Sequence, residues 1–251
     1  MSISRRDFLK GTAAAGAAAV LMLPSPKKAT AKASFLVTPE GKMGRMIPTL
    51  TNFDAYGGFR RKGITIIASG CGQGKTSYAA YLCAQATKLN SINTLCLSYT
   101  GERAIYGQFE QHKRYCRGSQ ITIFPSIKDS EPHRLDVLQR YLKVSKPDLI
   151  LDDMGPIYDS NIAREIHRLA FDNNIAYVKT VQTNRSGKGD LCFSPALYGS
   201  ERLRWLANYG VHVRKFDEVP SFWEPKLVVK VIKNRYGPLG GYAVPISELF
   251  G

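Results

Sequence analysis

The chain has little acidic charge, few cysteines and no hydrophobic run long enough to cross a membrane. Its 251 residues include 35 Lys and Arg against 20 Asp and Glu, a formal net charge of +15. The small apolar stretch at 11–23 is 13 residues, whereas a spanning helix needs about 20. The length allows one substantial domain but not two large ones. The positive charge favours a polyanionic partner, either nucleic acid or an anionic membrane surface.

The cysteines form neither a disulfide framework nor a metal site. There are five, an odd number, with no C-x-x-C pair and no histidine at zinc-finger spacing: Cys71, Cys83, Cys96, Cys116 and Cys192. Cys83 and Cys96 lie inside apolar runs, so we predict that they are small core residues. This pattern favours a reducing compartment.

The first 33 residues differ in character from the body. Residues 4–10, Ser-Arg-Arg-Asp-Phe-Leu-Lys, resemble the twin-arginine export signal, and two Ala-x-Ala sites at 29–31 and 31–33 have the spacing that a signal peptidase needs. Six basic residues against one acidic residue give this segment a net charge of +5, which leaves +10 for the remainder. The predicted division is a signal or basic arm at 1–33, a linker at 34–47 and one domain at 48–251.

Apolar runs alternate with segments of helical length along the body. Buried strands are predicted at 64–68, 94–98, 121–124, 149–152 and 176–181. Helices are predicted at 76–89, 102–115, 133–144 and 162–173. This alternation predicts an α/β fold with a largely parallel sheet covered on both faces. Two later runs at 211–216 and 227–233, and a third at 242–245 after a Gly-Pro-Leu-Gly-Gly turn, predict an antiparallel extension.

A glycine-rich loop, Ser-Gly-Cys-Gly-Gln-Gly-Lys-Thr at 69–76, joins the first of these strands to the first helix. This is the context of a phosphate-binding loop, whose glycines let backbone N–H groups turn toward phosphate oxygens at the positive end of a helix. Lys75 can then reach the β- and γ-phosphates of ATP, and the Thr76 hydroxyl can bind Mg²⁺. The predicted nucleotide-binding residues are Ser69, Gly70, Cys71, Gly72, Gln73, Gly74, Lys75, Thr76 and Ser77.

Polar residues at the ends of other strands complete the predicted site. A phosphate loop needs a metal-binding carboxylate on a neighbouring strand, and Asp152 and Asp153 end the apolar run that begins at 149. Glu102, after the strand at 94–98, is the candidate base that activates water, although a glutamate at the start of a helix also interacts favourably with the helix dipole. Gln182 follows the strand at 176–181, where it can bond a γ-phosphate or be satisfied by backbone.

Together these residues resemble the RecA-fold, hexamer-forming ATPases, and most closely the motor domain of DnaB-type replicative helicases. Val-Gln-Thr-Asn-Arg at 181–185 is similar to that family's Ser-Gln-Leu-Asn-Arg, and 147–153 is similar to its Walker B strand. The resemblance implies a three-layer RecA-like fold, Asp153 as the Mg²⁺ ligand and Gln182 as the γ-phosphate sensor. Lys-Asn-Arg-Tyr-Gly-Pro-Leu-Gly at 233–240 resembles a segment that reaches the neighbouring subunit's ATP, which implies that Lys233 and Arg235 act in trans. Residues 199–204 are similar to the Gly-Ser-x-x-Leu-Arg stretch of phage primase-helicases.

Other features depart from that family. Thr-Gly-Glu at 100–102 resembles the Ser-Gly-Glu of RadA-type proteins, and Glu102 as base follows from that likeness. The basic loop at 184–189 suits phosphate contacts through Arg185 and Lys188, or is a solvated surface loop. The leading hypothesis is an ATP-driven helicase or translocase that forms a homo-oligomeric ring, a hexamer, on single-stranded DNA in replication. The alternatives are a RadA-like recombination ATPase and an ATP-binding regulatory or packaging module that does not unwind.

The export signal conflicts with ATPase chemistry, because ATP and replicating DNA are cytoplasmic. Three resolutions are open: translation begins instead at Met43 or Met46, the arm tethers the protein to a membrane surface, or the protein is exported. Several motifs in the right order support the ATPase and one local pattern supports export. We therefore favour a cytoplasmic location and expect no stable membrane span.

Overall fold

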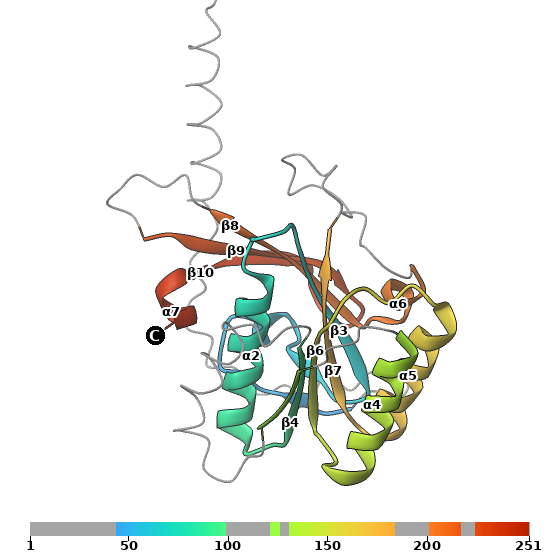
Figure 1. Ribbon diagram of the computed structural model, residues 1–251. Helices are drawn as coiled ribbons and strands as arrows, with labels where there is room; N and C mark the ends of the chain where they lie inside the picture. Colours follow the sequence, from blue (N-terminus) through green and yellow to red (C-terminus); the bar gives the residue numbers. More distant parts are fainter. Residues whose placement is uncertain (1–43, 99–120, 126–130, 184–200, 217–223, 251) are drawn as a thin grey trace, which may run out of the picture. The chain divides into compact units, whose positions relative to one another are not determined.

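The computed structural model describes residues 44–98, 121–125, 131–183, 201–216 and 224–250. These residues all belong to one compact unit, Leu36–Gly251. The described part of the chain folds around an eight-stranded sheet (Figure 1). Its strands in chain order are β3 (Gly63–Ser69), β4 (Thr94–Ser98), β5 (Ile121–Pro125), β6 (Leu149–Asp153), β7 (Ala176–Gln182), β8 (Tyr209–Phe216), β9 (Lys226–Asn234) and β10 (Gly240–Pro245).

The sheet is parallel over six strands and antiparallel at one end. Its spatial order is β10-β9-β8-β3-β7-β6-β4-β5. Every pairing from β8 to β5 is parallel, whereas β9 runs antiparallel to both β8 and β10. The predicted parallel sheet with an antiparallel extension is therefore confirmed.

Helices cover both faces of the sheet, which gives three layers (Figure 1). On one face, α2 (Lys75–Asn90) and α7 (Ile246–Phe250) pack into one hydrophobic cluster with β8, β9 and β10. On the other face, α4 (Glu131–Val144), α5 (Ser160–Asp172) and α6 (Glu201–Leu206) form a second cluster. Both clusters use residues of β3, all seven of which are buried, as expected for the central strand of a parallel sheet.

The predicted strands and helices agree with the structure to within a few residues at each end. The predicted helix at 102–115 lies outside the described residues. Small elements were not predicted: α6, α7, the 3-10 helix η1 (Asp54–Tyr56), and the two-stranded sheet of β1 (Met46–Ile47) and β2 (Phe59–Arg60). They are too short for hydrophobic periodicity to reveal.

One expectation about the sheet is wrong. The sequence analysis places the strand that ends in Asp153 next to the strand that leads into the phosphate loop, but β7 lies between β3 and β6. A buried run such as 176–181 has the same character at any interior position of a parallel sheet, so the local pattern gives no information about insertion. The inserted strand matters for the site, because it brings Thr180 beside Asp153.

Candidate functional site

The phosphate loop runs from the end of β3 to the start of α2, at the top of Figure 1. Gly72 and Gly74 have φ angles of 71° and 85°, in the left-handed region that favours glycine. Gly74 is the N-cap of α2, and no side chain in the described residues bonds to that cap. The N–H groups that begin α2 therefore lack a side-chain partner, which is the arrangement that an anion can complete.

The antiparallel extension supports this loop from one side. The Gln73 Oε1 atom accepts a hydrogen bond of 3.1 Å from the Lys215 backbone N–H of β8. Leu227 of β9 lies against Gly74, since a Cβ added at Gly74 would be 3.2 Å from Leu227 Cδ2. Ser69 is buried, and its backbone carbonyl accepts from the Thr183 N–H at 2.9 Å.

Two hydroxyl groups converge on the Asp153 carboxylate. Thr76 Oγ1 of α2 donates to Asp153 Oδ1 at 3.1 Å and lies 3.2 Å from Oδ2. Thr180 Oγ1 of β7 donates to Oδ1 at 2.5 Å. The structure thus brings together the two residues that the sequence analysis assigned to Mg²⁺, Thr76 and Asp153, at the end of the phosphate loop.

The charge state of Asp153 is set by competing effects. Burial raises the pKa of Asp153 above its ordinary value. The hydrogen bond from Thr180, the charges of Lys75 and Lys179 and the hydrogen bond from Thr76 all act in the opposite direction. A cation bound at this carboxylate would favour the ionised form further.

Asp152, which the sequence analysis paired with Asp153, has a different environment. Adjacent residues of a strand point to opposite faces of the sheet, and Asp152 is fully buried among Tyr177, Lys179 and Arg134 on the α4 side. Burial by itself would raise the pKa of Asp152, but the charges of Lys179 and Arg134 hold it below its ordinary value. The sequence analysis did not identify Lys179, although a lysine inside the apolar run at 176–181 was a visible signal.

Only some of the remaining predicted residues can be placed. Gln182 ends β7 and pairs with Ser69, the last residue of β3, so it lies at the same sheet edge as the phosphate loop. Glu102, Arg185 and Lys188 lie outside the described residues.

Lys233 and Arg235 lie at the opposite edge of the sheet from the phosphate loop of their own chain. Lys233 pairs with Gly210 near the start of β8, and β8 runs parallel to β3. The seven residues of β3 separate the two edges by about 20 Å, at roughly 3.3 Å per residue. Neither side chain can therefore contact its own phosphate loop.

The carbonyl groups at the end of α6 bind both of these cations. Lys233 Nζ donates to the Arg204 carbonyl at 2.5 Å and to the Trp205 carbonyl at 3.1 Å. Arg235 Nη2 also donates to the Trp205 carbonyl. Burial, then the charges of Arg235 and Arg204, lower the pKa of Lys233 to about 8.

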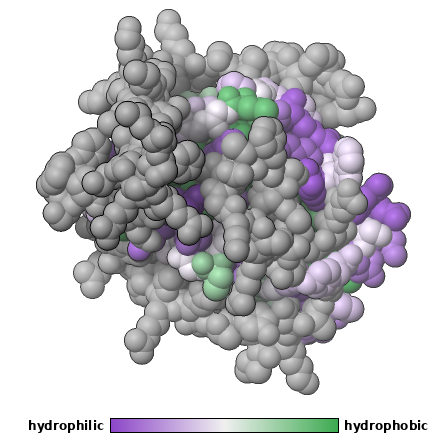
Figure 2. All heavy atoms as spheres, turned by 90° about the horizontal axis from the view of Figure 1, so that it is seen from above, coloured by the Kyte–Doolittle hydropathy of each residue, from purple (hydrophilic) through white to green (hydrophobic). Residues whose placement is uncertain are grey.

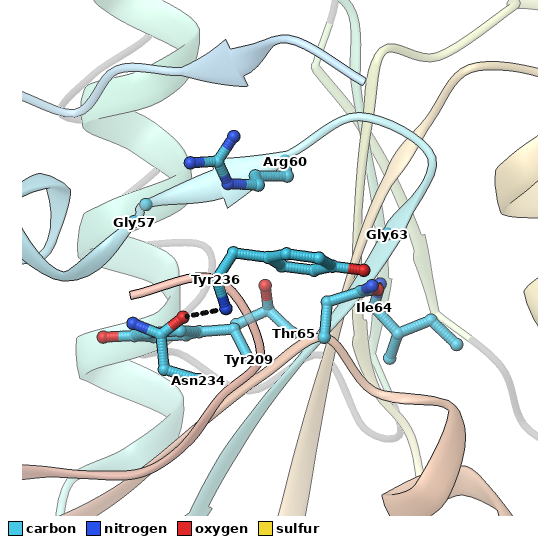
Figure 3. A pocket seen from close by; sticks show the side chains of 10 residues that line it. Gly57, Arg60, Gly63, Ile64, Thr65, Tyr209, Asn234 and Tyr236 are labelled. Atoms are coloured by element: carbon cyan, nitrogen blue, oxygen red, sulfur yellow. Dashed lines mark hydrogen bonds between the residues drawn. The ribbon is translucent and has the colours of Figure 1, made fainter. Parts of the chain in front are cut away.

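A small pocket lies beside these residues. It is lined by glycines of the 57–63 segment and by Arg60, Asn208, Tyr209, Asn234 and Tyr236 (Figure 3). Asn234 organises its rim, because its Oδ1 accepts from the Tyr236 N–H at 3.1 Å and its Nδ2 donates to the Tyr56 carbonyl at 2.7 Å. The pocket is at the start of β3, so it is separate from the phosphate loop.

Figure 2 looks down on the molecule from above, the side where the phosphate loop lies in Figure 1. Among the coloured residues in that view, hydrophilic surface predominates and hydrophobic surface is confined to small patches. A partner that meets this visible surface would make mainly polar contacts.

Comparison with known proteins gives one match within the sequence and two informative solved structures. The profile of the "TAT (twin-arginine translocation) pathway signal sequence" matches residues 2–22. None of the curated proteins matches the chain. In the part of the chain that the structure describes, no helix has the length and apolar character needed to cross a membrane.

The first solved structure is a DnaB-like replicative helicase, studied with its interactions with primase. It has 16% sequence identity and a TM-score of 0.59, over 75% of this chain and 56% of that chain. The second is the isolated ATPase domain of another protein, with 14% identity and a TM-score of 0.61, over 100% of this chain and 98% of that chain. The chain thus spans little more than half the length of the first protein and nearly all of the second. Both likenesses confirm the RecA-like expectation: this chain has the fold of the ATPase domains of DnaB-like helicases.

Proposed function

We propose that this protein is a DnaB-type motor that hydrolyses ATP with Mg²⁺ between the subunits of a ring and moves on single-stranded DNA. The contact between Thr76 and Asp153 at the end of the phosphate loop is the observation that carries the proposal. The net charge of +15 and the fold likeness to helicase ATPase domains support the same class of function. Because fold alone does not determine function, each part of the proposal needs its own test.

The described residues fit a magnesium nucleotide. They contain no cluster of three metal-binding His, Cys, Asp or Glu side chains, but Mg²⁺ bound with a nucleotide needs only one or two protein oxygens. The hydroxyl of Thr76 and the carboxylate of Asp153 supply such hard oxygen ligands within 3.1 Å of each other. Magnesium ATP, when bound, would supply the phosphoryl group that is transferred to water.

The residues of the chain would act by positioning and by electrostatics. The N–H groups of the glycine-rich loop would bind phosphate oxygens, and Lys75 would neutralise the β- and γ-phosphates. Gln182, at the same edge, would hydrogen-bond the γ-phosphate. Glu102 is proposed as the base that activates water, by its position in the sequence after β4.

Lys233 and Arg235 would serve the neighbouring subunit. Since they lie at the edge opposite to their own phosphate loop, they can contact a nucleotide only if another copy presents its loop to them. A head-to-tail contact of this kind is heterologous, and a closed ring such as a hexamer satisfies it. The two cations would then neutralise charge that develops on the γ-phosphate during hydrolysis.

A mixing experiment tests this arrangement with the full chain. Lys75→Ala should lose nucleotide binding, and Arg235→Ala should bind nucleotide but hydrolyse little. Mixing the two inactive variants should restore part of the activity, because one contributes the cation and the other an intact phosphate loop at the same interface. Lys88→Ala at the other end of α2 and Arg168→Ala on α5 are matched controls that should keep activity. Failure of the mixture to exceed either variant would count against catalysis in trans.

The DNA part of the proposal has a separate readout. ATP hydrolysis should increase with single-stranded DNA at low salt, and Arg185→Ala with Lys188→Ala should weaken binding and flatten its salt dependence. Absence of stimulation would exclude a single-strand motor. Preference for branched DNA would support the RadA-like alternative, and nucleotide binding without strand separation would support a regulatory or packaging module.

The compartment is the third part of the proposal. The nucleotide site supports a cytoplasmic location, whereas the match of residues 2–22 supports export. Mass spectrometry of the natural N-terminus, together with cell fractionation, separates the two. An N-terminus at Ser34 in a periplasmic fraction would overturn the cytoplasmic assignment.

A further inference from the structure

A buried lysine lies behind the turn that presents Asp153. Lys179 Nζ donates to Asp152 Oδ1 at 3.0 Å, to the Asp152 carbonyl at 3.3 Å and to the Met154 carbonyl. The acceptors therefore lie on the residues immediately before and after Asp153. One ammonium group holds the backbone on both sides of the proposed metal ligand.

The Asp152 carboxylate holds the same turn. Its Oδ1 accepts from the Met154 backbone N–H at 3.0 Å, and its Oδ2 accepts from the Tyr177 hydroxyl. Arg134 Nη1 of α4 lies 3.9 Å from Oδ2. The turn is thus fixed by contacts from β7 and α4 as well as by its own strand.

None of these contacts reaches the phosphate loop directly. Asp152 and Lys179 lie on the α4 side of the sheet, whereas Asp153, Thr76 and Thr180 meet on the α2 side. Lys179 can influence the site only through the backbone of 152–154 and through its charge. It is therefore a candidate positioning residue and not a catalytic one.

Stability alone does not account for this ion pair. Both side chains are fully buried, and replacing a buried ion pair by apolar residues of similar volume is often neutral or stabilising. Ligand positions, in contrast, must be held within a fraction of an ångström. We propose that Lys179, paired with Asp152, is a positioning residue that orients Asp153 for the Mg²⁺ of a bound nucleotide.

This inference rests on the proposed function, and its test separates the two. The main variant is Asp152→Leu with Lys179→Met, because Lys179→Met alone leaves a buried carboxylate without its partner and risks unfolding. A fluorescent ATP analogue is titrated into the full chain with and without Mg²⁺. The variant should bind the Mg²⁺-free analogue as the unmutated protein does, but its gain in affinity from Mg²⁺ should fall by about tenfold, as for other residues that support a metal ligand.

Two controls address folding. Thr87→Val with Thr94→Val removes another buried polar pair, joined at 2.7 Å, at the end of α2 far from the phosphate loop, and should leave the gain from Mg²⁺ unchanged. Asp152→Asn with Lys179→Gln keeps an amide donor at position 179 and should give an intermediate gain. If the apolar variant does not fold, as judged by thermal melting, this polar variant carries the same test.

The outcomes distinguish the inference from the function on which it rests. If Mg²⁺ does not strengthen binding to the unmutated protein, or if Asp153→Ala keeps the full gain, the proposed metal site itself is wrong. If Asp153→Ala loses the gain while the folded variants at 152 and 179 keep it in full, the positioning role of Lys179 is overturned.

Discussion

Alanine substitutions at the glycines of the phosphate loop should differ sharply in their effect on stability. Gly72 and Gly74 have left-handed backbone, whereas Gly70 does not. The three sites also differ in the space available for a Cβ atom. The series Gly70→Ala, Gly72→Ala and Gly74→Ala therefore separates backbone strain from crowding within one loop.

The expected magnitudes follow from these two differences. At Gly72 no atom lies within 4 Å of an added Cβ, so the change should cost only the left-handed strain, about 1–2 kcal/mol. At Gly74 the added Cβ would be 3.2 Å and 3.5 Å from the Leu227 methyl groups. Leu227 is only 1% exposed and has little room to move, so crowding should add about 1–3 kcal/mol to the strain. At Gly70 the nearest atom, Gln73 Cγ, is at an ordinary contact distance of 3.5 Å, and the change should stay within about 0.5 kcal/mol.

The assay is urea unfolding of the full chain, which gives the free energy of unfolding of each variant. The expected order of destabilisation is Gly74→Ala, then Gly72→Ala, then Gly70→Ala. Gly72→Asn should cost less than Gly72→Ala, because asparagine tolerates left-handed backbone better. Equal losses at Gly70 and Gly74, or equal losses for Ala and Asn at Gly72, would refute the reasoning.

Three further predictions use other parts of the structure. Leu82→Ala, in the fully buried part of α2, should lower the free energy of unfolding by about 2–5 kcal/mol, while Leu50→Ala, at a side chain 79% exposed, should change it by less than about 0.5 kcal/mol; urea unfolding checks both. Because the pKa of Lys233 is lowered to about 8, its cation is lost as pH rises through that value, and the rate of ATP hydrolysis should decline there. Lys233→Arg should remove the decline, and an unmutated protein without it would contradict the role. Thr180→Val removes a hydrogen bond that lowers the pKa of Asp153, so this carboxyl should stay protonated to higher pH, and Mg²⁺-dependent nucleotide binding should require higher pH in a titration.

Much of the fold could be predicted because its elements are long and regular. The buried run of β3, the glycine-rich turn and α2 are recognisable within one stretch of sequence. The order of strands is different, since β7 carries no local mark of its place between β3 and β6. Strand order results from long-range packing, which a single sequence does not display directly.

The candidate site could be predicted in part for the same reason. Thr76 lies in a contiguous motif, and Asp153 was selected over Asp152 by a family likeness. Strand alternation supplies the physical reason for that choice, because it turns Asp152 toward Lys179 on the opposite face. The attachment of Lys233 to the end of α6 joins segments about 30 residues apart, and no spacing rule could have predicted it.

Strand β9 extends from one edge of the sheet to the other. Near its start, Leu227 packs on Gly74 of the phosphate loop, and near its end Lys233 is held at the opposite edge. The paired strands β8 and β10 keep β9 straight between these points. A change in the loop that displaces Leu227 would therefore be transmitted along the strand to Lys233. In an assembly, the occupancy of one nucleotide site would then alter the cation offered to the next, so that neighbouring sites would not act independently.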